Sequence, residues 1–98
     1  MLTVDTWIKR SSAVLEAEVG DEVVALHAEK GFCYGLNKIG SRIWRLTAAP
    51  VRVGDICSHL QQEYDVQASV CQADVLELLE GLQAEGLIDL VPGEIALL

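Results

Sequence analysis

Residues 53–98 lack basic residues altogether. All seven Lys and Arg residues lie at or before Arg52, where six acidic residues nearly balance them, whereas residues 53–98 carry nine acidic residues. Phosphate backbones and anionic lipids are bound through Lys and Arg. This absence therefore argues against nucleic-acid and membrane-surface partners.

Long apolar runs are also missing. No run approaches the roughly 18 residues of a membrane span, and the segment Met1–Arg10 has no hydrophobic signal core, which predicts a cytoplasmic protein. With 98 residues, of which 51% are hydrophobic, the chain is long enough for one modest core. We expect a single domain spanning residues 1–98.

Motifs of catalysis and metal binding are absent as well. The three cysteines, Cys33, Cys57 and Cys71, match neither C-x-x-C nor a zinc pattern. Cys57 and His59 stand two residues apart, which points them in different directions on a helix. No nucleophile elbow, H-E-x-x-H or nucleotide-binding glycine motif occurs. The sequence predicts no catalytic residues, no metal site, no cofactor and no enzymatic activity.

Three apolar runs near the N-terminus predict strands. Residues 13–19, 22–28 and 32–37 are separated by the turn signals Gly20-Asp21 and Glu29-Lys30-Gly31. Such short turns favour an antiparallel meander. Alternate residues of the third strand then share a face, and this strand presents an unpaired edge that an extended peptide could join.

Helical spacing dominates the rest of the chain. Asn37 is a candidate cap for a helix from Lys38, residues 53–65 form a second helix, and Ser69 is a candidate cap for a third that runs to about Glu85. Residues 87–91 and 94–98 predict a terminal hairpin around Pro92-Gly93. The predicted fold class is α+β: a winged helix-turn-helix with an N-terminal three-stranded antiparallel sheet, three helices and a C-terminal hairpin.

A winged helix usually suggests DNA binding, but the third helix carries Asp74, Glu77 and Glu80 and no basic residue. Peptide recognition fits better, in a groove between the third strand and the third helix. Val70 and Leu76 flank the apolar stripe of that helix. They either line such a groove or only widen the core face.

Lys38, Arg42 and Arg45 form a basic stripe on the first helix. This stripe is either a solvated face that offsets nearby acids or a contact surface for a peptide or partner protein.

The segment Gly31–Leu46, Gly-Phe-Cys-Tyr-Gly-Leu-Asn-Lys-Ile-Gly-Ser-Arg-Ile-Trp-Arg-Leu, resembles the strand-three and helix-one signature of PqqD-like proteins. Val53-Gly-Asp-Ile56, Glu63-Tyr-Asp-Val66 and Glu85-Gly-Leu-Ile88 continue the likeness along residues 13–91. These proteins are RiPP recognition elements, the leader-binding domains of pathways for ribosomally made, modified peptides. The residues Tyr34–Asn37 and Ile43-Trp44 resemble the stand-alone leader-binding proteins of lasso-peptide clusters most.

The resemblance implies a function. Such a domain binds the leader of a precursor peptide as an extra strand, antiparallel to strand three and against helix three. It presents the precursor to a leader peptidase of the transglutaminase-like cysteine protease type and, as a further expected partner, to an ATP-dependent cyclase. Two alternatives stay open: a leader-binding chaperone of another pathway, such as quinone cofactor biosynthesis, and a winged-helix transcription regulator.

The resemblance also implies site residues. The strand edge comprises Phe32, Cys33, Tyr34, Gly35 and Leu36, and the helix side comprises Val70, Asp74, Val75 and Leu78. Arg42 and Arg45 are candidate contacts for the leader or the partner enzyme. Asp74 is either an acceptor for a leader donor or a carboxylate that compensates the helix N-terminus.

Overall fold

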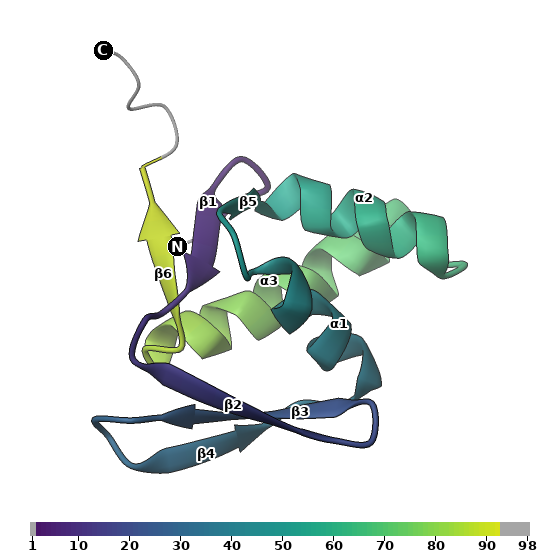
Figure 1. Cartoon of the computed structure of the whole chain (residues 1–98). Helices are drawn as coiled ribbons and strands as arrows, with labels where there is room; N and C mark the ends of the chain where they lie inside the picture. Colours follow the sequence, from purple (N-terminus) through teal and green to yellow (C-terminus); the bar gives the residue numbers. More distant parts are fainter. Residues whose placement is uncertain (1, 93–98) are drawn as a thin grey trace.

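The structure, a computed structural model, describes residues 2–92. In it, three helices are combined with two small antiparallel sheets, in the orders β5-β1-β6 and β2-β3-β4 (Figure 1). The chain is therefore α+β, as predicted.

The predicted meander is present as β2 (Val14–Val19), β3 (Glu22–His27) and β4 (Phe32–Gly35). Gly20 and Gly31 occupy its two turns with φ of 68° and 73°, a left-handed conformation that glycine adopts without steric cost. Val23, Ala25 and His27 of β3 are buried towards the helices, and the residues between them are half-exposed on the opposite face. The sheet lies beneath the helices in Figure 1, with β4 at one of its edges.

The second sheet was missed by sequence reasoning. It consists of β1 (Trp7–Arg10) flanked by β5 (Val51–Arg52) and β6 (Ile88–Val91). Strand β6 is the first strand of the predicted terminal hairpin, and it pairs with β1 from Trp7↔Val91 to Arg10↔Ile88. The predicted second strand, residues 94–98, lies outside the described residues.

The helices are α1 (Lys38–Leu46), α2 (Val53–Glu63) and α3 (Ala68–Ala84). The Asn37 side chain caps α1 by accepting a hydrogen bond from the Gly40 N–H (2.8 Å), as predicted. The predicted Ser69 cap is wrong: α3 begins at Ala68, two residues before the start that a Ser69 cap implies, and its N-cap residue Gln67 makes no side-chain capping bond. Gly86, with φ of 77°, follows the end of α3.

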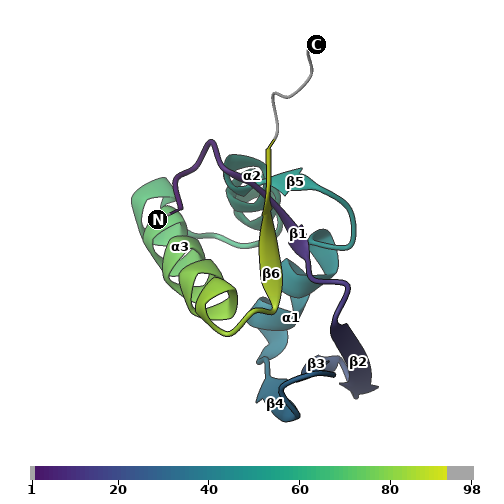
Figure 2. The ribbon, with the colours of Figure 1, turned by 90° about the vertical axis from the view of Figure 1, so that its left-hand side faces the viewer.

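A polar cluster around Trp44 ties β1, β2 and α1 together. Trp44 is fully buried, and its indole N–H donates to Glu16 Oε1 (2.9 Å). Arg10 stacks over the ring at 4.8 Å, pairs with the same Glu16 carboxylate and donates from Nη2 to the Trp44 carbonyl (2.8 Å). The first helix is thereby held against both sheets, and Figure 2 shows α1 between them.

Candidate functional site

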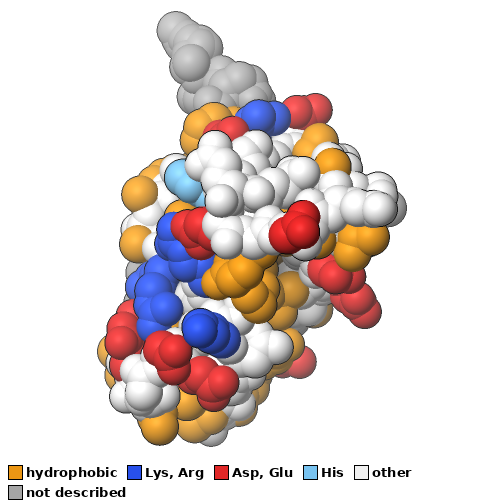
Figure 3. All heavy atoms as spheres, turned by 90° about the vertical axis from the view of Figure 1, so that its right-hand side faces the viewer, with side chains coloured by type: hydrophobic (Ala, Val, Ile, Leu, Met, Phe, Trp, Pro, Cys, Tyr) orange, Lys and Arg blue, Asp and Glu red, His pale blue; other side chains and the backbone are white. Residues whose placement is uncertain are grey.

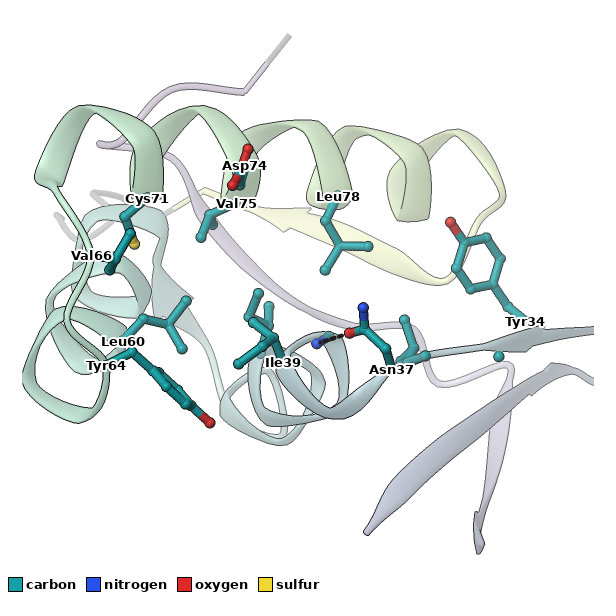
Figure 4. Close-up of a pocket in the computed structure, with 14 residues that line it drawn as sticks. Tyr34, Asn37, Ile39, Leu60, Tyr64, Val66, Cys71, Asp74, Val75 and Leu78 are labelled. Atoms are coloured by element: carbon teal, nitrogen blue, oxygen red, sulfur yellow. Dashed lines mark hydrogen bonds between the residues drawn. The ribbon is translucent and has the colours of Figure 1, made fainter.

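A groove of about 560 Å³ opens between α3 on one side and the end of β4 with α1 on the other (Figure 4). Apart from one carboxylate, its lining is uncharged. The lining residues are Tyr34, Gly35, Leu36, Asn37, Ile39, Gly40, Ile43, Leu60, Tyr64, Val66, Cys71, Asp74, Val75 and Leu78.

The strand side of the groove ends in an open backbone edge. Strand β4 is last in the order β2-β3-β4, so its outer side has no strand partner within residues 2–92. The Leu36 N–H donates to the Val23 carbonyl (2.9 Å). Tyr34, two residues before Leu36, is paired with Ala25 of β3. Because antiparallel strands alternate inward-bonded and outward-facing residues, the N–H and C=O groups of Cys33 and Gly35 face away from the sheet.

The end of this strand is fixed by Ser41. The fully buried Ser41 hydroxyl accepts from the Val23 N–H (2.7 Å) and donates to the Leu36 carbonyl (3.2 Å). It thereby replaces one rung of the β3–β4 ladder and joins the sheet to α1. The edge consequently keeps a fixed position relative to the groove.

The opposite wall is one face of α3. Cys71, Asp74, Val75 and Leu78 are spaced by three and four residues, which places them on the same side of the helix. Cys71 and Val75 are buried, Leu78 is half-buried, and Asp74 is exposed. The wall is therefore apolar with a single carboxylate.

The end of the groove distant from β4 was missed by sequence reasoning. It is formed by Ile39, Leu60, Tyr64 and Val66, where α1 meets the α2–α3 connection (Figure 4). Ile39, Leu60 and Tyr64 stand in helical apolar stripes, a pattern typical of core residues. Ile39 (39% exposed) and Tyr64 (36%) instead reach the surface. The sequence offered no signal for this, because Tyr64 lies inside the predicted helix 53–65, whereas α2 ends at Glu63 and no further helical turn covers Tyr64.

The structure brings six of the nine predicted site residues together in the groove: Tyr34, Gly35, Leu36, Asp74, Val75 and Leu78. Cys33 belongs to the open edge but not to the groove lining. Phe32 packs edge-on against His27 at 5.8 Å, and Val70 is 47% exposed outside the lining. Leu76 is packed against the core. That these residues bind a peptide remains a prediction.

The basic stripe on α1 is paired with acids of the same chain. Arg42 donates to both carboxylate oxygens of Glu63, at 2.9 Å from Nε to Oε1 and 2.6 Å from Nη2 to Oε2. This hydrogen bonding lowers the pKa of Glu63 and raises that of Arg42. Arg45 lies 3.7 Å from Glu18, and Lys38 lies 4.0 Å from Asp21. Figure 3 shows blue side chains beside red ones, with hydrophobic atoms gathered in the middle of this face.

The Cys57 thiol in the helical layer is unsuited to nucleophilic chemistry. Burial, followed by the proximity of Cys71, raises the pKa of Cys57 to about 11. The Cys71 Sγ lies 3.8 Å from the Cys57 carbonyl. Within residues 2–92, no three His, Cys, Asp or Glu side chains are grouped to hold a metal ion. No helix in that part of the chain is long and apolar enough to cross a membrane.

An open strand edge beside an apolar groove defines the class of site that accepts an extended chain by strand addition. The family model for coenzyme PQQ synthesis protein D (PqqD) matches residues 22–88, which include the edge, the groove and all three helices. The chain therefore belongs to the PqqD family, as the sequence resemblance predicted.

Solved structures agree with this assignment. One, described as TbiB1 in complex with the TbiA(beta) leader peptide, is 36% identical with a TM-score of 0.78, over 83% of this chain and 94% of that one. Another, lasso peptide synthetase B1 complexed with the leader peptide, shares the fold with a TM-score of 0.70 at 20% identity, over 84% of this chain and 96% of that one. No curated protein sequence matches this chain significantly.

Proposed function

We propose that this protein binds the leader segment of a ribosomally made precursor peptide, as an extra strand on β4 with side chains in the groove. The observation that carries the proposal is the open edge of Cys33 and Gly35 directly beside the apolar groove. The 36% identity to TbiB1, solved with a leader peptide, supports it. The resemblance of Tyr34–Asn37 and Ile43-Trp44 to the stand-alone proteins of lasso-peptide clusters favours a lasso-peptide pathway over quinone cofactor biosynthesis.

The two parts of the site have different roles. The outward N–H and C=O groups of Cys33 and Gly35 offer main-chain hydrogen bonds, which give affinity with little dependence on sequence. Leu78, Val75 and the far end around Tyr64 offer apolar contacts that discriminate between side chains. Specificity for one leader therefore comes from the groove.

The same surface is unsuited to DNA. If the three helices followed by β6 serve as a winged helix-turn-helix, α3 would be its reading helix. It presents the exposed Asp74, Glu77 and Glu80, which repel phosphates. Helix α3 therefore gives the transcription-regulator alternative no surface for reading DNA.

The protein acts without chemistry of its own in this proposal. Residues 1–98 form one binding domain in the cytoplasm that hands the precursor to a leader peptidase of the transglutaminase-like cysteine protease type and to an ATP-dependent cyclase. The raised pKa of the Cys57 thiol accords with a non-catalytic role.

The proposal predicts a short precursor gene beside this one, and fluorescence anisotropy with a labelled leader peptide from that predicted precursor tests it. We expect saturable binding of this leader and none of a scrambled peptide of equal composition. Equal binding of the two peptides, or no binding of either, contradicts the proposal. A gel-shift assay with upstream DNA is expected to show no complex.

A further inference from the structure

Asp74 is the one charged side chain among the residues that line the groove. It is exposed and, within residues 2–92, has no hydrogen-bond or ion-pair partner. It also lies outside the first turn of α3, which contains no acidic residue. Compensation of the helix N-terminus, which acts within the first turn, therefore does not account for it.

The cations of this chain do not neutralise it. Five of the seven pair with other acids: Arg10 with Glu16, Lys38 with Asp21, Arg42 with Glu63, Arg45 with Glu18, and Arg52 with Asp5 and Asp55. Lys30 lies 3.5 Å from the Glu85 carbonyl, and Lys9 is on β1. Glu77 and Glu80 on the same helix add negative charge.

A peptide that fills the groove removes water from this carboxylate. Burying a charge without a partner is unfavourable, whereas a charge-assisted hydrogen bond compensates it. The occupant that best fits an otherwise uncharged groove is therefore mainly apolar and carries one positive charge opposite Asp74.

We infer that Asp74 is a specificity-determining residue that binds a Lys or Arg side chain of the leader peptide. This inference rests on the proposed function and adds a sequence requirement to it.

The position of the basic residue in the leader follows from the geometry. Asp74 and Leu78 are one helical turn apart, about 6 Å along the axis. Figure 4 shows α3 running along the groove. Two residues of an extended peptide span about 6.6 Å, and residues two apart point to the same side. The basic residue thus stands two positions from the apolar residue that contacts Leu78.

Four variants test this with the labelled leader of the predicted precursor: Asp74→Asn, Asp74→Ala, Asp74→Lys and the control Glu77→Gln. Glu77 is exposed on the same helix but does not line the groove. We expect Asp74→Asn and Asp74→Ala to lose about tenfold in affinity and most of the salt dependence, and Glu77→Gln to bind within about twofold of wild type. Asp74→Lys is expected to recover affinity for a leader whose basic residue is replaced by Glu.

Three results decide against the inference. Wild-type affinity in both Asp74→Asn and Asp74→Ala removes any role for the residue. If Asp74→Asn keeps the affinity and Asp74→Ala loses it, the leader presents a neutral hydrogen-bond donor to residue 74 and not a cation. The amide oxygen of Asp74→Asn would still accept a hydrogen bond from such a donor. No saturable binding to the wild-type protein overturns the proposed function as well, so the two failures are distinguishable.

Discussion

The sheet β2-β3-β4 has two outer edges, and they differ in what surrounds them. The Ala28 N–H donates to the Ala13 carbonyl (2.8 Å), so the alternation along β2 turns the main-chain groups of Glu16 and Glu18 outwards. On β4 the outward groups belong to Cys33 and Gly35. Both edges thus offer main-chain donors and acceptors.

Side chains separate the two edges. Glu16 and Glu18 place charges along β2, held by Arg10 and Arg45, and charged side chains discourage strand addition at an edge. Cys33 and Gly35 bring no charge, and a Cβ added at Gly35 would meet nothing within 4 Å. Only β4 adjoins the groove. An exposed edge therefore becomes a selective binding site when a side-chain groove lies beside it.

The largest expected effect is on the groove. Leu78→Glu places a carboxylate in the apolar wall, and we expect leader affinity to fall about 100-fold because a bound peptide would desolvate that charge. Anisotropy measures the affinity, and circular dichroism checks the fold. Val19→Glu, at a 68% exposed position on β2, is the matched control and should bind as wild type. A folded Leu78→Glu variant with unchanged affinity would show that the groove is misplaced.

A substitution on β2 is expected to lower the stability of the fold and to leave leader affinity unchanged. Glu16→Ala removes the acceptor of the buried Trp44 N–H and the partner of Arg10, so the free energy of unfolding should fall by about 1–3 kcal/mol. Leader affinity below the unfolding transition should stay within about twofold. Urea unfolding and anisotropy on the same sample measure the two effects. A large loss of affinity with stability intact would place the peptide at the β2 edge.

Main-chain pairing predicts a smaller, alternating effect. Methylation of one leader amide removes a donor, and each amide that faces β4 should contribute about fivefold to affinity. Amides at the positions between them should tolerate methylation, because they point away from the sheet. A scan of singly methylated leaders measures this pattern. Uniform sensitivity along the peptide would contradict strand addition.

The smallest effect concerns the Arg42–Glu63 pair, which joins α1 to α2 next to the groove. The pKa of Glu63 is lowered from its ordinary 4.5 by its hydrogen bonds to Arg42. The pair therefore stabilises the fold above the unfolded-state pKa, and this contribution is lost as the pH falls through the folded-state pKa. Urea midpoints between pH 7 and about pH 3 should fall less for Glu63→Gln than for wild type. An equal fall of the urea midpoint in wild type and in Glu63→Gln would show that the Arg42–Glu63 pair does not contribute to the pH dependence of stability.

Local signals predicted the parts of the fold that are local. Alternation and the turn glycines Gly20 and Gly31 located the meander, and Asn37 marked the start of α1. Strand β1 has four residues and pairs with segments about 40 and 80 residues away along the chain. No short-range pattern specifies such pairing, so the second sheet could not be found.

The same distinction applies to the site. Strand periodicity predicted an open edge on the third strand with a groove against the third helix, but the site residues Tyr34–Leu36, Asp74, Val75 and Leu78 were implied by the resemblance to PqqD-like proteins. Ile39 and Tyr64 occupy positions with the same periodicity as core residues. Whether such a position is buried or lines a groove depends on how α1, α2 and α3 pack, which periodicity does not encode.

Hydrogen exchange of single backbone amides, with and without the leader peptide, tests the central claim most directly. In the free protein the Cys33 and Gly35 amides face outwards on an open edge and should exchange quickly, as should those of Glu16 and Glu18. The account predicts that the leader slows exchange at Cys33 and Gly35 and leaves Glu16 and Glu18 unchanged. Protection at Glu16 and Glu18, or saturable binding without protection at Cys33 and Gly35, would contradict it.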